Sequence, residues 1–376
     1  MAATFVGRPG PRTCSGSHRR PHATSTSRWR GATSTLSTSQ LALVDGRSLY
    51  LDFFGFVAWD LLPLNPNEIR QIEVIRGPAS AMWGANALDG VINFISKTPR
   101  ELDGNGAAIS FGPFDRSVNG LDADAGTMFS VNGTHARAVN DRWAYKLSAG
   151  GYTSDAFARP TGLIPGTQTP YPSFVNQGTT QPKFDTRVDY DAPEGRYKLV
   201  FAGGYAGTDG IIHTGIGPFD MDGGVGLGYA TMRYSRKALR LNFFTNQLNG
   251  DATALLSFGP NGLPIPFGFN TKTYDFELGN VNTLGSRQVV SYGGNARYCK
   301  LALYRPAARS HGIGRRPPLP DHVVPIASVG QSINVLALSS SWLVWHAAQQ
   351  VARRFRHHRG LACGQRLTEV AASVGR

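Results

Sequence analysis

The sequence has few of the features that mark enzymes, metalloproteins or helical membrane proteins. Its three cysteines, Cys14, Cys299 and Cys363, are too few and too far apart for a zinc quartet or a disulfide framework. The longest apolar candidate, Ser332–Trp345, is interrupted by three consecutive serines and is shorter than a transmembrane helix of about 18 to 20 residues. A nucleophile elbow, a His-Glu-x-x-His motif, a phosphate loop and a dinucleotide-binding glycine pattern are all missing in suitable context. We therefore expect no enzymatic activity, no metal site and no cofactor.

The positive charge of the chain lies at its two ends. The formal net charge is +13, which would suggest a nucleic-acid partner. Residues 1–29 contain five arginines and no acid, however, and residues 299–376 contain eleven basic and two acidic residues. The 22 basic and 23 acidic residues of 30–298 nearly cancel. We therefore expect no nucleic-acid partner.

The two ends also differ from the middle in composition. All three cysteines and seven of the nine histidines lie there, without a helix or strand period. Residues 1–29 and 299–376 are interpreted as basic tails translated out of frame, or alternatively as natural disordered tails. Ser332–Trp345 could at most form a helix. No export signal is visible in residues 1–29.

Leu41–Lys97 is typical of a small, mostly β module. Short apolar runs at Leu41–Val44, Ile72–Ile75 and Val91–Ile95 alternate with segments rich in Gly, Pro, Asn and Asp. Asn65-Pro66-Asn67-Glu68 predicts a helix of one or two turns, with Asn65 as its cap and Glu68 as the capping-box acceptor.

From residue 104 onward, apolar and polar residues alternate with a period of two. Such a period, with aromatic residues on one face and charges on the other, is typical of a lipid-facing barrel wall with a water-lined interior. We expect nine strands, with short turns at one end and long polar loops at the other. The strands are expected near 104–112, 127–137, 142–153, 183–191, 196–206, 225–235, 239–249, 271–280 and 288–298; the short turns at 138–141, 192–195 and 236–238; and the loops at 113–126, 154–182, 207–224 and 250–270.

Two loops contain a D-x-D-x-G sequence, at 122–126 and 220–224. We interpret both as Asp-Gly turns, with a calcium loop as the alternative, because the third acid and the closing glutamate are missing. His135 and His213 are isolated, so we assign them no metal.

Three motifs in a fixed order give the chain a family resemblance. They are V-D-G-R-S at 44–48, I-E-V-I-R-G-P-A-S-A-x-W-G-A-N-A at 72–87 and G-V-I-N-x-I-S-K at 90–97. Together they resemble the second half of the plug domain of TonB-dependent outer-membrane receptors, and Arg30-Gly31 looks like the pair that precedes it there. The resemblance implies a partial plug at 30–100 and the first part of a transmembrane β-barrel at 101–298. The fold class is then mainly β: a partial plug followed by an incomplete antiparallel barrel of about nine strands, with irregular basic tails.

The resemblance also implies roles for individual residues. Arg30, Glu73 and Arg76 are expected to latch the plug to acidic residues of the wall, some of them on later strands not found here; the alternative is solvated surface charge. Five glycines are expected to form turns of the plug: Gly31, Gly46, Gly77, Gly84 and Gly90.

Receptors of this kind reside in the Gram-negative outer membrane and import a scarce ligand of the siderophore, cobalamin or oligosaccharide class, driven by the TonB-ExbB-ExbD complex. Outer-membrane lipid and that complex are therefore the implied partners, although a TonB box is not found here and the ligand stays unknown. The family closes a barrel of about 22 strands, so we expect this chain to be a fragment that does not transport alone. A plain porin-type barrel and a soluble β-sheet carbohydrate-binding protein are the alternatives.

Overall fold

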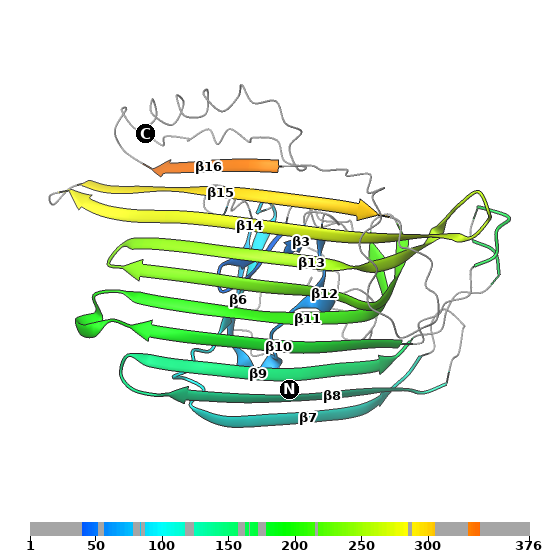
Figure 1. The fold of residues 1–376 in the computed structure, drawn as a ribbon, viewed down its shortest axis with the longest axis horizontal. Coiled ribbons are helices and arrows are strands. Elements are labelled where there is room, and N and C mark those ends of the chain that lie inside the picture. The colour runs from blue at the N-terminus through cyan, green and yellow to red at the C-terminus, as the bar shows by residue number, and fades with distance from the viewer. Residues whose placement is uncertain are drawn as a thin grey trace, which may run out of the picture.

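The computed structural model describes residues 40–51, 56–77, 83, 87–116, 124–156, 162–164, 166–171, 178–214, 217–284, 288–304 and 330–338. These residues form a small mixed sheet, called the plug sheet below, and a large antiparallel sheet, called the wall (Figure 1). The plug elements lie behind the wall in Figure 1, against one of its faces.

The plug sheet has four strands in the order β2-β1-β6-β5. Strand β1 pairs in parallel with β6, and the other pairs are antiparallel. The strands are β1 (Gln40–Val44), β2 (Arg47–Ser48), β5 (Ile69–Arg76) and β6 (Gly90–Ser96); a hairpin of β3 (Tyr50–Leu51) and β4 (Phe56–Val57) and the short 3-10 helices η1 (Trp59–Leu61) and η2 (Pro66–Glu68) complete the plug. The three strands expected from the apolar runs are thus confirmed.

Alternate residues of β1 pack on opposite faces of the plug sheet. Leu41 and Leu43 contact Ala87 and Val91 on one face. On the other face, Ala42 and Val44 belong to a second cluster. The remaining members of this second cluster are Leu49, Val57 and Leu64, with Trp59, Leu62, Ile69 and Phe94 packed against it. This small core on both faces orders the module.

The wall has ten strands in sequence order, from β7 at one edge to β16 at the other. They are β7 (Gly104–Phe114), β8 (Gly126–Ala138), β9 (Trp143–Asp155), β10 (Gly178–Asp191), β11 (Lys198–Thr214), β12 (Gly217–Arg236), β13 (Leu239–Phe258), β14 (Pro264–Leu284), β15 (Gln288–Tyr304) and β16 (Gly330–Leu338); the 3-10 helix η3 (Pro193–Gly195) lies in the turn between β10 and β11. The nine expected wall strands are confirmed, and each expected short turn joins the strands foreseen.

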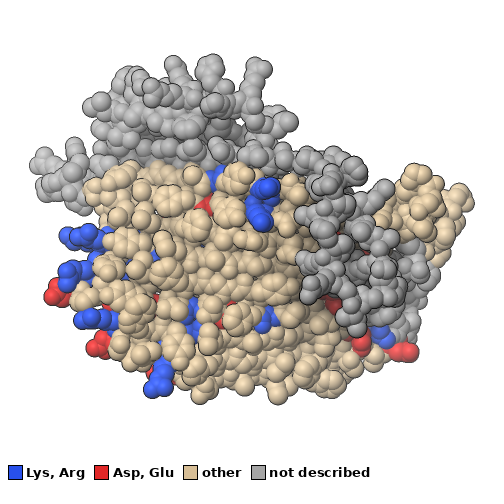
Figure 2. Space-filling view, viewed as in Figure 1, with Lys and Arg blue, Asp and Glu red and all other residues tan. Residues whose placement is uncertain are grey.

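The two faces of the wall are apolar outside and polar inside. Ile109 and Phe111 are each 71% exposed, and large apolar residues of other wall strands are exposed as well: Phe129, Val131, Leu147, Phe184, Phe201, Tyr205, Met232, Phe243, Phe276 and Tyr298. Buried residues on the opposite face include many polar and charged ones, among them Asn132, Lys146, Ser148, Gln181, Asp185, Arg187, Asp189, Asn246, Thr273 and Asp275. Figure 2 shows that much of the outer surface is uncharged. The alternation along the sequence therefore separates an apolar exterior from a polar interior.

Three expectations about the wall are corrected by the structure. Strands β11 to β14 extend through most of 207–224 and 250–270, where loops were expected, because main-chain pairing continues there after the side-chain alternation ends. The D-x-D-x-G sequence at 220–224 consequently lies within β12, at an irregularity in its pairing with β13, and not in a loop. Residues 330–338 form strand β16, paired with β15, where an irregular tail or a helix was expected.

Within the described ranges, none of the helices is long and apolar enough to cross a bilayer. The same ranges contain no group of three or more His, Cys, Asp or Glu side chains arranged to hold a metal ion. The D-x-D-x-G sequence at 122–126 begins in residues outside these ranges.

Candidate functional site: the plug and wall interface

A buried ion triad joins the plug to the wall. Lys146 of β9 places its Nζ 2.7 Å from Glu68 Oε2 of the plug and 2.7 Å from Asp185 Oδ2 of β10. Thr134 of β8 donates a hydrogen bond of 2.8 Å from Oγ1 to Glu68 Oε1. The side chains of Glu68 and Lys146 are 0% and 1% exposed. Two carboxylates thus share one cation where water does not screen them.

The single turn η2 directs Glu68 into the wall. Pro66 begins this turn, and the Glu68 backbone N–H donates to the Asn65 carbonyl oxygen at 3.0 Å. The expected capping box does not form, since Asn65 makes no side-chain cap hydrogen bond. The Glu68 carboxylate instead binds Lys146 and Thr134 and accepts a long 3.4 Å bond from Asn65 Nδ2, because lysine offers a full opposite charge that a backbone amide lacks.

The triad continues through Asp185 to an arginine of the plug. Tyr229 of β12 donates a hydrogen bond from its hydroxyl to Asp185 Oδ1. The guanidinium of Arg47 stacks on the Tyr229 ring, with Cζ 3.8 Å from the centroid, and donates from Nη1 to Asn246 Oδ1 at 2.8 Å. Asn246 in turn donates to the Ser48 carbonyl oxygen at 2.9 Å. Burial lowers the pKa of Arg47, which the charges of Asp185 and Asp45 partly offset.

A second group of ion pairs surrounds Asp45, in the turn between β1 and β2. Its carboxylate accepts hydrogen bonds from the backbone N–H and the hydroxyl of Ser96, at 2.9 and 2.6 Å. Arg187 lies 3.7 Å from the same carboxylate and binds Asp189 through two nitrogens at 2.6 and 3.0 Å. Arg233 donates to the Asp45 carbonyl oxygen at 3.0 Å. The V-D-G-R turn thus contacts three wall strands, β10 and β12 directly and β13 through Arg47 and Asn246.

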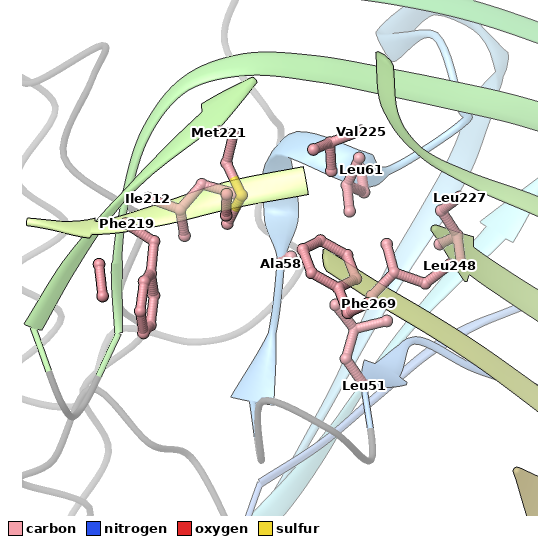
Figure 3. Close-up of a cluster of buried hydrophobic side chains, with 12 residues drawn as sticks. Leu51, Ala58, Leu61, Ile212, Phe219, Met221, Val225, Leu227, Leu248 and Phe269 are labelled. Atoms are coloured by element: carbon pink, nitrogen blue, oxygen red, sulfur yellow. The ribbon is translucent and has the colours of Figure 1, made fainter. Parts of the chain in front are cut away.

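An apolar contact lies farther along the lumen (Figure 3). Leu51, Ala58 and Leu61 of the plug pack against buried wall residues, namely Ile212, Phe219, Met221, Val225, Leu227, Leu248, Ala252, Ala254 and Phe269. Asp60, beside this cluster, accepts a hydrogen bond of 2.9 Å from Gln181 Nε2. Burial raises the pKa of Asp60, while the Gln181 bond and the charge of Lys183 oppose the rise. The plug is therefore held by charges at one level and by apolar packing at another.

A plug side chain packs closely against the wall backbone at Gly150 of β9. A Cβ atom there would lie 2.7 Å from Asn65 Oδ1 of the plug and 3.0 Å from the Val131 carbonyl oxygen of β8. Glycine leaves the space that Asn65 occupies. Next to this point, Asn67 donates to Asn132 Oδ1 at 2.6 Å.

Two of the residues expected to form the latch, Glu73 and Arg76, are not among the docking contacts described above. The Glu73 carboxylate, on β5, accepts hydrogen bonds from Gln71 and Asn93 of the plug at 3.0 and 3.1 Å. Arg76 is exposed at the end of β5. Arg30 lies outside the described residues, so the latch role of these three residues stays a prediction.

The turn glycines can be placed in part. Gly46, Gly77 and Gly90 have φ of 86°, 100° and 152°, a backbone conformation that side chains disfavour. Gly46 forms the turn of the V-D-G-R motif, between β1 and β2. Gly31 and Gly84 lie outside the described residues.

The sequence contained a signal for the contacts that were missed. Lys146, Asp185, Arg187 and Asp189 all lie on the polar face of the expected wall strands. The sequence did not show which of them face the plug, because Glu68 and Asp45 were assigned to a helix cap and a turn. The docking of the plug decides the pairing.

Comparison with known proteins was made for sequence and for fold. Residues 6–91 match the family described as the TonB-dependent receptor plug domain, a range that includes residues 6–29, assigned above to a tail. Over 36 residues, 10% of this chain and 5% of the relative, the chain is 50% identical to the ferric enterobactin receptor PirA of Pseudomonas aeruginosa.

Solved receptor structures are similar in fold. A mutant ferric enterobactin receptor of Pseudomonas aeruginosa in complex with enterobactin superposes with a TM-score of 0.50 and 15% identity, covering 79% of this chain and 47% of that receptor. The siderophore receptor PirA of Acinetobacter baumannii superposes with a TM-score of 0.48 and 13% identity, covering 70% of this chain and 41% of that receptor. The chain thus spans less than half the length of these receptors. Residues 6–91 thus match the plug domain of TonB-dependent receptors, and the described fold is similar to that of a receptor plug with part of its barrel sheet.

Proposed function

We propose that this chain supplies the plug and part of the wall of an outer-membrane receptor that imports a ferric siderophore. The observation that carries the proposal is the plug docked by buried ion pairs on the polar face of a wall whose other face is apolar. A soluble carbohydrate-binding protein would bury its apolar face, and a plain porin would have no plug. The siderophore class is supported by the 50% identity over 36 residues with a ferric enterobactin receptor.

The ion pairs suit a plug that must stay seated and yet move. A buried charge that loses its partner costs about 3 to 5 kcal/mol, so separating Glu68 from Lys146 before water reaches them opposes undocking of the plug. The hydrogen bonds of such a pair are short-ranged and water that enters the gap screens the charges, so a displacement of a few ångströms removes most of the attraction. We propose that force supplied by the TonB-ExbB-ExbD complex loosens the plug by separating Glu68 from Lys146 and Asp45 from Arg187.

We also propose that the chain by itself does not transport. In the part that the structure describes, β7 and β16 are unpaired edges of an open ten-stranded sheet. An open sheet does not enclose the plug, and unpaired main-chain groups are unfavourable in lipid.

The test uses the full chain, fused to an export signal, in a Gram-negative host that lacks its own siderophore receptors. We expect the chain in the outer-membrane fraction, released by detergent and not by salt, with no TonB-dependent uptake of ferric enterobactin. A complete ferric enterobactin receptor in the same host is the positive control. Recovery of folded chain in the soluble fraction would refute the membrane assignment. Uptake by the chain alone would refute the proposal that the chain by itself does not transport.

The ligand class is tested separately by binding. The outer-membrane fraction containing the chain is incubated with radioactive ferric enterobactin, cobalamin or maltodextrin, with membranes of the empty host as the control. We expect saturable binding of the ferric siderophore alone. Binding of cobalamin or maltodextrin in its place would refute the siderophore class and leave the receptor assignment standing.

A further inference from the structure

Four aromatic rings form a row across neighbouring wall strands at the short-turn end. Trp143 begins β9, Tyr190 lies near the end of β10, Tyr197 precedes β11, and Tyr234 lies near the end of β12. The ring centroids are 4.6 Å apart for Trp143 and Tyr190, 5.9 Å for Tyr190 and Tyr197, and 5.7 Å for Tyr197 and Tyr234. Trp143 is 46% exposed. Tyrosine and tryptophan at such a level are typical of the boundary between hydrocarbon and lipid headgroups.

Beyond this row, the short turns are rich in basic residues. Five exposed basic side chains lie in or beside them: Arg142, Arg196, Arg236, Lys237 and Arg240. Four acidic residues lie in or beside the same turns: Asp103, Asp141, Asp191 and Glu194. Figure 2 shows several lysines and arginines at this end, on the left of the view. Arg236 lies two residues beyond Tyr234 in β12, so its side chain shares the outward face of the aromatic row.

Most of these basic groups are not neutralised by carboxylates. Arg196 lies 3.8 Å from Glu194. The other ion pairs of this end join Arg100 and Lys198, which are not among the five, to Asp191. Among the described residues, no ion pair involves the remaining four. The short-turn end therefore presents a net positive rim directly outside its aromatic row.

The opposite end of the wall has the reverse balance. Its described charged residues include more acidic than basic side chains, namely Asp115, Asp124, Asp155, Asp209, Asp220 and Asp251 against Arg116, Lys183, Lys272 and Lys300. If the charged residues were distributed at random, the two ends of the wall would not differ in the sign of their net charge. The difference indicates that the two ends of the wall face different surroundings.

We infer that the short-turn rim binds the headgroups of anionic phospholipids in the leaflet that surrounds it. An anionic lipid satisfies both parts of the surface, because its phosphate and glycerol head can reach the arginines while its acyl chains lie along the exposed aromatic and aliphatic side chains. A free phosphate would contact the basic groups alone and would gain nothing from the aromatic row. The acyl chains of a zwitterionic lipid would contact the aromatic row, but its neutral headgroup would be attracted only weakly to the basic side chains.

The test measures which lipid the full chain retains. The chain, folded in vesicles with equal amounts of phosphatidylglycerol and phosphatidylcholine of the same acyl chains, is extracted in a zwitterionic detergent, and its retained lipids are quantified by mass spectrometry. We expect an enrichment of phosphatidylglycerol of at least about fivefold. Soluble glycerol phosphate in excess should leave this enrichment unchanged.

Two matched double variants separate the rim from charge in general. In R236Q/K237Q the enrichment should fall by up to about fivefold per charge removed. In K272Q/K300Q, which removes two basic residues paired across β14 and β15 away from the rim, it should stay as in the parent chain. Circular dichroism checks that each variant retains its strands, and R142Q/R240Q replaces R236Q/K237Q if that variant fails to fold. Equal retention of the two lipids by the parent chain, or an equal loss in both variants, would overturn the inference.

Discussion

Replacing Lys146 by methionine should loosen the plug while leaving the wall folded. Methionine has nearly the volume of lysine but no charge, so Glu68 and Asp185 would remain buried, 0% and 7% exposed, without their shared cation. Removing one partner of a buried ion pair costs about 3 to 5 kcal/mol. Because about 1.4 kcal/mol corresponds to a factor of ten, the equilibrium between docked and undocked plug should shift by about two to three and a half orders of magnitude.

Hydrogen exchange measures this shift directly. The backbone amides of β1 and β6 should exchange faster in the Lys146→Met variant, while those of β12 and β13 keep their protection. Arg70→Gln is the matched control, since Arg70 and Glu101 form an exposed pair at 3.4 Å that is worth at most about 1 kcal/mol. The double variant Glu68→Gln/Lys146→Met should recover part of the loss, because it removes one of the two uncompensated carboxylates. The reasoning is refuted if the plug amides of Lys146→Met exchange as slowly as those of the control.

Three further outcomes are expected at the same interface. Leu61→Ala should destabilise plug docking by about 2 to 5 kcal/mol, because it opens a cavity in the apolar cluster, and limited proteolysis near residue 61 should show it. Gly150→Val should displace Asn65 and raise plug exchange, whereas Gly151→Val, where a Cβ meets nothing within 4 Å, should not. Burial raises the pKa of Asp60, so protonated Asp60 stabilises docking fully below the pKa of the undocked plug and less as the pH rises through the pKa of the docked plug. The exchange protection of residues 58–62 should therefore fall with rising pH, and Asp60→Asn should abolish this fall.

The wall could be predicted from the sequence because its two faces differ so strongly. Phe184, Val188 and Tyr190 alternate with Asp185, Arg187 and Asp189, and a period of two can only be satisfied by a strand with unlike surroundings on each side. The ends of the longer strands could not be predicted in this way. Beyond Thr208 and Gln247, glycines and mixed side chains interrupt the alternation, while the main-chain ladder continues.

The docking contacts were harder to predict for a different reason. A carboxylate such as Glu68, three residues after Asn65, has the same spacing in a capping box as in this tertiary contact, so the sequence does not distinguish the two. The alternatives are separated only when the plug is placed against Lys146, which is 78 positions away along the chain. Local spacing predicts local hydrogen bonds, and the long-range partner prevailed here because it is charged.

The length of strands β11 to β14 has a consequence for access to the lumen. Strand β13 has 20 residues, which at roughly 3.3 Å each and a tilt of about 45° give a height of about 47 Å. A hydrocarbon layer of about 30 Å would leave about 17 Å of paired strand outside the hydrocarbon. Solutes would then approach the plug beside rigid paired hairpins. Antibodies and phages would meet a surface of fixed shape there, whereas flexible loops would offer a changing one.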